Sequence, residues 1–541
     1  MPSDAPRARD GTQLDELRVL EGPNRFFTRP AVKLEFSSPT PGAAARVAQR
    51  AGENVRRLHE MLDLPAPRLA FRRSHDDLRA IVAYPWRRRI ISQSIGSSAA
   101  RIALGARRLQ TELAGLRSVA MGPLAHMSQP QVPIVAITGT NGKSTTTRLV
   151  AHIAASAGRR VGMTNSDGIF IGGQLVEAGD WTGYGGAARV LSEPGLDLAV
   201  LETARGGILL RGIGYARNDV SVVTNVSADH LGLNGIDTVD ELAEVKSAVV
   251  RITRRDGWTV LNAQDERTYE MRRRTRAHLY VFSLDPDAAA VRRTLRRGGR
   301  AAVYRNGWLV LRRPDRRPLR LVPAVEVPVT FAGMSRNNIA NALAAVAACD
   351  ALGITPRRIR AGLRSFALDE ATNPGRLNLF ARDGRLVLVD FAHNEAGLRG
   401  LLEVSRALAG SARVLLALGT AGDRTDAILR SLGRAAGEAA DIVVICQKEH
   451  YLRGRDAMEM AQLFIDGAAE GGLDPAGIDI LPNEVASLEE LLRRSTRGDV
   501  VTVMSHADRQ QVFDWLHAAG YAPVGYADLQ AILPASVTAE G

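Results

Sequence analysis

The sequence of 541 residues contains little cysteine and no long apolar segment. Only Cys349 and Cys446 are present, nearly a hundred residues apart. This spacing provides neither a disulfide framework nor a metal-binding motif, as expected for a chain in a reducing cytoplasm. No apolar run approaches the roughly 20 residues of a membrane-spanning helix, so we expect no membrane partner. The first ten residues, MPSDAPRARD, lack the apolar core of a secretory signal. We therefore predict a cytoplasmic localisation.

Basic residues exceed acidic ones, with 70 Lys and Arg against 58 Asp and Glu and a net charge of +12. One interpretation is attraction to a polyanion, such as nucleic acid or an acidic polymer. The other, which we favour, is an arginine-rich solvated surface. The densest basic segment, residues 292–320, alternates with apolar residues around Asn306-Gly307, which predicts a β-hairpin at a sheet edge. No RNA-binding or helix-turn-helix signature accompanies it, so we expect no nucleic-acid partner.

Residues 138–146 read Thr-Gly-Thr-Asn-Gly-Lys-Ser-Thr-Thr, between an apolar run and a helix-like stretch at 146–157. A strand, a glycine-rich turn and a helix start surround a phosphate with backbone N–H groups. Lys143 can reach the β- and γ-phosphates, and the Ser144 hydroxyl suits Mg²⁺. Ile137 stands where the usual P-loop has its first glycine. We predict a nucleoside triphosphate site whose cradle is formed by Gly139, Thr140, Asn141, Gly142, Lys143, Ser144 and Thr145.

The order of predicted elements indicates an α/β protein of three domains. Residues 1–125 are predicted to form an α+β N-terminal domain with a strand at 32–36 and helices at 43–62 and 94–114. Residues 126–372 are predicted to form a P-loop domain with a doubly wound parallel sheet, because apolar strands alternate with helices. Residues 373–541 are predicted to form a smaller Rossmann-like domain.

The predicted strands of the two larger domains are short apolar runs. In the P-loop domain they lie at 132–138, 161–164, 196–202, 220–225, 259–261 and 279–282, and a helix at 337–352 closes the series. In the last domain they lie at 386–391, 414–418, 442–445, 478–481 and 500–504.

Polar residues that follow these strands are candidates for chemistry, because ligands of open α/β sheets lie beyond the carboxyl ends of the strands. Glu202 ends one strand, and Asp229-His230 follows another. Lys246 lies sixteen residues after His230 on a predicted helix. A carboxylate and an imidazole near the P-loop could hold a second Mg²⁺ beside the one on Ser144. Each residue alone is a weak signal, since a strand-end glutamate is usually a cap or an ion-pair partner.

Together these motifs resemble the ATP-dependent Mur ligase superfamily over about residues 130–510. Asn338 and Asn341 resemble the family's helix that meets the adenine, with Asn337 where the family usually has His. Pro374-Gly375-Arg376 resembles the hinge whose arginine reaches the nucleotide. The segment Asp-Phe-Ala-His-Asn is similar to the family motif that supplies ATP contacts from the C-terminal domain. The resemblance assigns these contacts to Arg376, Asp390 and His393.

Within the superfamily, the closer resemblance is to the C-terminal half of cyanophycin synthetases. It is carried by residues 164–171, 202–208, 228–233 and 452–455, and by Leu-Glu-Gly-Pro-Asn at 20–24. Those enzymes have an ATP-grasp domain between the opening motif and the Mur-like half. Only about a hundred residues separate Asn24 from the P-loop linker, so we expect that domain, and its aspartate-adding site, to be absent. The site resembling the arginine-adding one is kept.

The resemblance implies an amide ligase that uses ATP and Mg²⁺ through an acyl phosphate. Lys143, Glu202, His230 and Lys246 would be catalytic, and Ser144, Glu202 and His230 would hold metal. Lys246 would be carbamylated, with an ordinary ammonium paired with phosphates as the alternative. Asp167 and Arg205 are substrate candidates. Asp167 or Glu395 could pair with a cationic amine, although a turn role for Asp167 fits equally well; Arg453 and Arg455 could hold an acidic chain or be ordinary surface residues.

Three functions are therefore compared. The first is a ligase that joins an amino acid or amine, such as arginine, to a carboxylate acceptor, for example on an acidic peptide. The second is the same chemistry on polyglutamate or a small molecule. The third is a nucleotide-binding accessory subunit without catalysis, which the intact Lys143 and Glu202 disfavour. We also expect a homo-oligomer.

Overall fold

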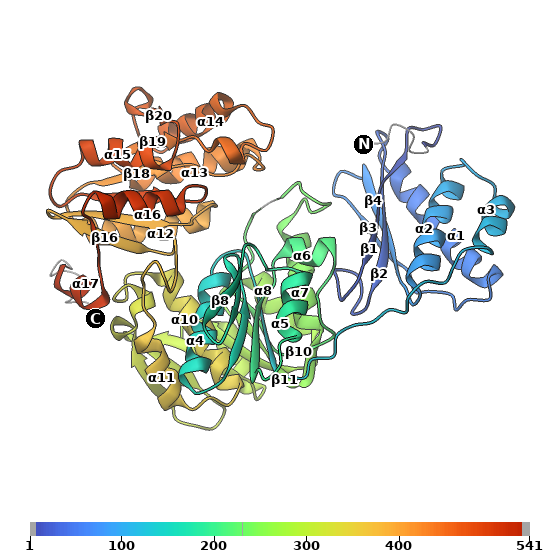
Figure 1. The fold of residues 1–541 in the computed structure, drawn as a ribbon, viewed down its shortest axis with the longest axis horizontal. Helices are drawn as coiled ribbons and strands as arrows, with labels where there is room; N and C mark the ends of the chain where they lie inside the picture. Colours follow the sequence, from blue (N-terminus) through green and yellow to red (C-terminus); the bar gives the residue numbers. More distant parts are fainter. Residues whose placement is uncertain (1–6, 230, 533–541) are drawn as a thin grey trace.

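The computed structural model describes residues 7–229 and 231–532, which form three sheets with their own helices (Figure 1). The N-terminal sheet is antiparallel with the order β1-β2-β4-β3, and α1 and α2 pack on one face around a core that includes Phe36, Tyr84 and Ile95. The elements are β1 (Gln13–Leu20), β2 (Ala31–Ser37), α1 (Ala43–Met61), β3 (Ala70–Arg73), β4 (Arg79–Pro85), α2 (Arg89–Ala103) and α3 (Leu109–Leu116).

The central sheet has eleven strands in the order β15-β14-β13-β12-β11-β10-β5-β9-β6-β7-β8. Its strands are β5 (Ile134–Thr138), β6 (Val161–Thr164), β7 (Gly168–Ile171), β8 (Gln174–Ala178), β9 (Leu198–Glu202), β10 (Asn218–Val223), β11 (Thr253–Asn262), β12 (His278–Ser283), β13 (Arg300–Arg305), β14 (Trp308–Arg312) and β15 (Leu319–Pro323). Its helices are α4 (Lys143–Ser156), α5 (Tyr184–Leu191), α6 (Arg205–Leu210), α7 (Val239–Arg251), α8 (Glu266–Glu270), α9 (Ala289–Arg296), α10 (Arg336–Ala351) and α11 (Pro356–Ser365).

In the order of the sheet, the seven strands β13-β12-β11-β10-β5-β9-β6 pair in parallel, and helices cover both faces of this part of the sheet. One core joins the sheet to α4, α10 and α11, and another joins it to α5, α6 and α7. Apolar strands such as β5 are buried throughout, as expected for a parallel sheet covered on both sides. The predicted hairpin at the sheet edge is confirmed: β13 and β14 are antiparallel, and Asn306 and Gly307 between them adopt φ values of 48° and 77°.

The C-terminal sheet has the order β20-β19-β18-β21-β17-β16-β22, parallel from β20 to β17. Its elements are β16 (Asn378–Arg382), β17 (Arg385–Asp390), α12 (Glu395–Ala409), β18 (Val414–Leu418), α13 (Asp426–Ala439), β19 (Ile442–Cys446), α14 (Ala457–Glu470), β20 (Asp479–Leu481), α15 (Glu484–Arg494), β21 (Val500–Met504), α16 (Arg509–Ala518), β22 (Ala522–Pro523) and α17 (Tyr526–Ile532). Helices α12, α13 and α14 cover one face, and α15 and α16 cover the other.

The predicted fold class is therefore confirmed. The predicted domain boundaries at residues 125 and 372 remain a proposal; both fall in segments between the sheets. The single helix predicted at 94–114 is wrong, because the chain forms α2 and α3 with a break between them. Gly105 follows Leu104 with a φ of 76°, a left-handed conformation that ends the first helix. Within the described residues, no helix is both long and apolar enough to cross a membrane.

Candidate active site

The glycine-rich turn after β5 depends on two glycines that approach other side chains closely. Gly139 has a φ of 154°, and a Cβ placed there would lie 1.8 Å from Thr224 Oγ1. Gly142 is the N-cap of α4 with a φ of 80°, and its Cβ would lie 2.1 Å from Asn341 Oδ1. Only glycine combines this conformation with this space. The turn is therefore packed closely against Thr224 and Asn341.

Alanine at Gly139 is expected to distort the turn, because its Cβ would force the side chain of Thr224, which follows β10, out of its position. We expect Gly139→Ala to weaken nucleotide binding by about 100-fold, in line with the effect of an ångström-scale displacement in a binding site. Isothermal titration calorimetry with ATP measures this loss.

The matched control is Gly158→Ala, since Gly158 also has a positive φ of 87° but no atom lies within 4 Å of its Cβ position. That variant carries the conformational cost, about 1 kcal/mol of stability, without the clash. Equal ATP affinity in the two alanine variants would contradict the packing argument.

The turn is fixed by hydrogen bonds to residues after β10. The Thr140 N–H donates to Asn225 O and the Asn141 N–H donates to Asn225 Oδ1, each at 2.9 Å. The Thr224 hydroxyl donates to Asn141 O at 2.6 Å. Lys143 curls over the turn, with its Nζ donating to Thr140 O at 2.8 Å. The conformation of the turn is thus supported by hydrogen bonds within the protein.

Glu202 ends β9, opposite Ile137 in the neighbouring P-loop strand. Its side chain is only 4% exposed, and no described residue hydrogen-bonds to its Oε2. Burial raises the pKa of this carboxyl, although the charge of Lys143 and a hydrogen bond from Ser144 oppose the shift. A buried carboxylate oxygen without a partner beside the phosphate cradle is a ready cation ligand.

Lys246 projects from α7 onto the other side of the P-loop. It is 3% exposed, and its Nζ donates to Gly139 O at 2.6 Å. Burial, together with the positive charge of Lys143, lowers the pKa of this amine well below its ordinary value, and Asp229 opposes the shift. Burial therefore favours the neutral amine. The predicted catalytic residue His230 lies outside the described residues.

A cleft lies between the P-loop and the C-terminal domain. Its lining includes the predicted nucleotide residues Asn338, Arg376, Asp390 and His393. Burial lowers the pKa of Arg376, with Asp390 opposing the shift, and the guanidinium lies 4.6 Å from the centre of the Phe391 ring. Burial raises the pKa of Asp390, against the charge of Arg376. Asp390 also accepts a hydrogen bond from the Leu377 N–H at 2.9 Å.

Helix α10 forms one wall of the cleft. Asn341 Nδ2 donates to Asn338 Oδ1 at 2.9 Å, so the two asparagines of the motif hold one another. Asn337, which replaces the usual histidine, faces α12: a Cβ at Gly400 would lie 2.0 Å from Asn337 Nδ2. The small residue at 400 therefore makes room for Asn337.

Side chains also contact one another directly across the cleft. Asn141 Nδ2 donates to Asn394 Oδ1 at 3.0 Å, and Asn394 Nδ2 donates back to Asn141 Oδ1 at 2.8 Å. His393 Nε2 lies 3.7 Å from Asp229 Oδ2. The structure therefore has the two domains closed on each other at the mouth of the nucleotide site.

The two predicted substrate residues have different surroundings. Asp167 forms ion pairs with Arg148 from α4 and with Arg509 from α16, each at 2.8 Å. Burial opposes ionisation of Asp167, but the two arginines, Arg509 first, outweigh it and lower its pKa. Arg205, at the start of α6, donates to Leu233 O at 3.4 Å, and burial lowers its pKa. The substrate roles of Asp167 and Arg205 remain predictions.

The remaining predicted substrate contacts lie on the C-terminal domain. Arg455 is engaged with Asp426 and Glu459, whereas Arg453 is exposed beside the Tyr451 ring. Glu395 pairs with Arg399 on α12.

Sequence reasoning missed Arg509 and Asn225, which organise the closed site. Arg509 begins α16 just beyond the carboxyl end of β21, so the strand-end rule could have found it. Asn225 likewise follows β10 within the segment Val-Val-Thr-Asn-Val-Ser. Neither residue is an acidic or imidazole side chain, the types expected to ligate Mg²⁺ at a strand end.

A glycine-rich turn on the doubly wound central domain thus faces a smaller Rossmann-like domain across a cleft. Two family models match this arrangement: the Mur ligase middle domain over residues 137–349 and the Mur ligase glutamate ligase domain over residues 375–507. The chain belongs to the Mur ligase superfamily.

Among the superfamily, the chain is similar to cyanophycin synthetases. It is 41% identical to the enzyme of Crocosphaera subtropica over 376 residues, which is 70% of this chain and 42% of the relative. It is 28% identical over 411 residues to the UDP-N-acetylmuramoyl-L-alanyl-D-glutamate–2,6-diaminopimelate ligase of Geobacter metallireducens, over 71% of this chain and 76% of that one. The chain spans less than half the length of the cyanophycin synthetases it matches.

Solved structures show the same fold at low identity. E. coli FolC in complex with DHPP and ADP superposes with a TM-score of 0.52 at 18% identity, over 72% of this chain and 90% of that one. A pseudomurein peptide ligase type C from Methanothermus fervidus gives 0.50 at 16% identity, over 72% and 80%.

Proposed function

We propose that this protein is an ATP-dependent amide ligase that activates a carboxylate as an acyl phosphate and couples it to an amino acid or amine. The observation that carries the proposal is the meeting, in one cleft, of the P-loop and Lys143 with the charged residues of the C-terminal domain. The 41% identity to a cyanophycin synthetase over the Mur-like part supports arginine as the amine and an acidic peptide as the acceptor.

The residues around the P-loop fit a divalent cation. Glu202 Oε2, which has no hydrogen-bond partner among the described residues, and the Ser144 hydroxyl are oxygen ligands, which Mg²⁺ prefers. Among the described residues, no group of three His, Cys, Asp or Glu side chains could hold a metal by itself. A nucleotide's phosphates would add further oxygen ligands. A cation bound there would neutralise phosphate charge during phosphoryl transfer.

In the first step, a carboxylate oxygen of the acceptor attacks the γ-phosphorus of ATP, and the bond to the β-phosphate oxygen breaks to release ADP. Lys143 and the backbone N–H groups of the turn would hold the β- and γ-phosphates. Arg376 and Asp390 would orient the nucleotide from the opposite side of the cleft. Burial favours the neutral amine of Lys246, which would react with CO₂ and lose a proton to form a carbamate, a carboxylate-like group beside Gly139.

In the second step, the amine nitrogen attacks the acyl carbon, phosphate leaves, and the nitrogen loses a proton to form the amide. The acyl phosphate must be kept from water until the amine arrives. The Asn141–Asn394 pair and the Asp167–Arg509 ion pair would hold the domains closed during this time. Arg205, at the edge of this site, would contact the acceptor.

ADP release tests the proposal. The protein is supplied with Mg²⁺-ATP, aspartyl and glutamyl peptides as acceptors, and a panel of amino acids that begins with arginine. We expect ADP to form only when an acceptor and an amine are both present, with mass spectrometry showing a product joined by one amide bond. A coupled enzyme assay for ADP gives the rates.

Two outcomes would change the conclusion. ADP release that is independent of both substrates would indicate an ATPase. ATP binding without ADP release for every pair would favour the accessory role, in which the protein serves a separate enzyme.

A further inference from the structure

The opening motif around residue 24 contacts the central domain over a continuous surface. Residues 21–25, here named the docking segment, follow β1 in the sequence and contact the region of α6 and α7 in the central domain. The Glu21 N–H donates to Arg211 O and the Ile213 N–H donates to Pro23 O, each at 2.7 Å. A Cβ at Gly22 would lie 1.8 Å from Ile213 O, so the two backbones touch. The segment therefore lies against the end of α6, the helix that begins with Arg205.

Asn24 holds the docking segment in a tight turn. It is 1% exposed, and its Nδ2 donates to Gly22 O and Arg29 O at 2.9 and 3.0 Å. Its Oδ1 accepts from the N–H groups of Phe26 and Phe27. The side chain of Asn24 thus hydrogen-bonds backbone groups within the turn and fixes the direction in which the chain continues to Arg25.

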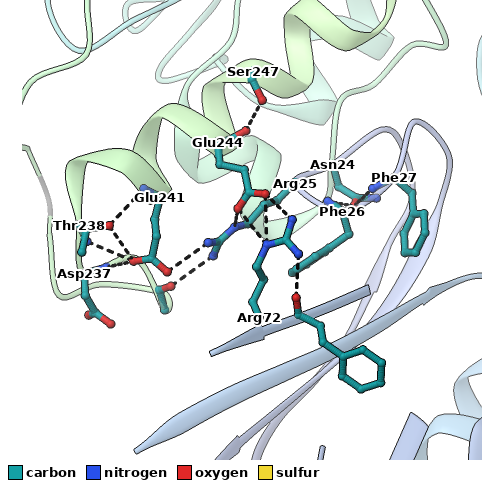
Figure 2. A network of polar contacts seen from close by, with 12 residues as sticks. Asn24, Arg25, Phe26, Phe27, Arg72, Asp237, Thr238, Glu241, Glu244 and Ser247 are labelled. Atoms are coloured by element: carbon teal, nitrogen blue, oxygen red, sulfur yellow. Dashed lines mark hydrogen bonds and ion pairs between the residues drawn. The ribbon is translucent and has the colours of Figure 1, made fainter. Parts of the chain in front are cut away.

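Arg25 is 3% exposed and reaches α7, more than two hundred residues away in the sequence (Figure 2). Its Nε donates to Glu244 at 2.8 Å and its Nη2 donates to Glu241 at 3.1 Å. Arg72 from β3 bonds the same Glu244 carboxylate. Arg251, at the end of α7, donates back to Asn24 O and to Arg25 O. The helix is therefore held at both ends by the docking segment.

The other face of α7 carries Lys246. Residues two apart on a helix point in nearly opposite directions, so Glu244 faces the N-terminal domain while Lys246 faces the P-loop. The contacts agree with this geometry, since Lys246 Nζ bonds Gly139 O. Helix α7 is thus a rigid spacer between an N-terminal arginine and the turn that would hold phosphate. A guanidinium buried between two carboxylates is costly to displace, because each charge would lose its partner.

We propose that the docking segment is a positioning element of the nucleotide site, in which Arg25 holds α7 through Glu241 and Glu244 and so places Lys246 against the P-loop. This inference deepens the proposed function and rests on it for its kinetic test. It also gives the N-terminal domain a role in catalysis that does not require contact with substrate.

The test compares Arg25→Gln with Arg89→Gln. Arg89 is an exposed arginine of α2 that pairs with Glu21 of the docking segment but, among the described residues, forms no ion pair with α7, and Glu21 keeps its ion pair with Arg211 of the central domain when Arg89 is replaced. For Arg25→Gln we expect kcat for ADP release to fall by about 10- to 100-fold, as for a small displacement of a catalytic group. The KM for ATP should change by less than about threefold, because the P-loop itself is intact. Arg89→Gln should match wild type in both constants.

A double variant shows whether the effect passes through the ion pair. If Arg25 acts through Glu244, the losses in Arg25→Gln and Glu244→Gln will not add in the double variant. Additive losses would mean that Arg25 acts elsewhere and would overturn the proposal. Arg25→Lys, which keeps the charge but reaches one carboxylate, should recover part of kcat.

Hydrogen exchange supplies a readout that needs no activity. In the substrate-free protein, Arg25→Gln should speed amide exchange more in residues 239–251 than in residues 336–351 of α10, which separates a local effect on α7 from the general loss of stability that follows a broken buried ion pair. If wild type releases no ADP, the proposed function fails but the exchange result still decides this inference. Unchanged protection of α7, or a kcat within about threefold of wild type, overturns it.

Discussion

Lys143→Ala is expected to reduce ADP release by about three orders of magnitude, the effect of removing a preorganised charge from developing phosphate charge. In the structure, Lys143 Nζ lies over the turn, bonded to Thr140 O at 2.8 Å, where it can move onto a phosphate without rearranging the backbone. It also lines the cleft that Arg376 and Asp390 close from the other side. Initial rates at saturating Mg²⁺-ATP, with the best acceptor and amine, measure the loss.

Arg254→Ala is the control for a lost cation elsewhere in the same domain. Arg254 is a partly exposed residue of β11 that pairs with Asp219 and Asp256, and its removal should leave the rate unchanged. Thermal unfolding of both variants would separate a folding defect from a catalytic one. A Lys143→Ala protein that keeps more than about a tenth of the wild-type rate would contradict the role of this residue.

Glu202→Gln is expected to lower activity by a similar factor and yet to make the substrate-free protein more stable. The variant keeps the shape of the side chain but removes a buried charge whose Oε2 has no described partner. Burying a charge costs more free energy than burying a neutral polar group, so the neutral amide should raise the melting temperature. Activity should fall because the amide is a poorer ligand for the cation than a carboxylate.

The difference in stability between Glu202→Gln and wild type should depend on pH in a defined direction. Because burial raises the folded-state pKa of Glu202, the unfolded chain releases its proton first as the pH rises. Wild type therefore loses stability as the pH rises from the ordinary value of 4.5 through the raised folded pKa, and the Gln variant does not. Differential scanning calorimetry between pH 4 and pH 7 should show that the melting temperature of Glu202→Gln exceeds that of wild type by an amount that grows with pH. A difference that is constant, or that narrows on raising the pH without Mg²⁺, would contradict the burial argument.

Local signals in the sequence were enough for most of the fold. The P-loop was predicted because strand, turn and helix follow one another directly, and the structure places α4 directly after Gly142. The hairpin between β13 and β14 was predicted because Asn-Gly demands a left-handed turn. The break between α2 and α3 was missed, because a glycine inside an apolar helical pattern is also tolerated within helices.

The long-range contacts of the site could not be read from the chain. Asp167 was recognised as a candidate for substrate, but its partner Arg509 lies 342 residues later and no local pattern links the two. Arg25 is equally remote from Glu244 in sequence. Such pairs depend on how domains pack, and a charge in one sequence segment has dozens of possible partners elsewhere.

The docking segment also bears on how chains of this kind can change over evolution. The covalent link between α3 and β5 runs along the surface (Figure 1), and its last part, residues 126–133, has few bonds to the body. The N-terminal and central domains contact each other through residues 21–25 and through ion pairs such as Arg72–Glu244 and Arg79–Asp237, so the link contributes little to the interface. Exposed connections of this kind accept inserted domains readily. A whole catalytic domain could be inserted or lost at this junction while the contact of Arg25 with α7 is retained.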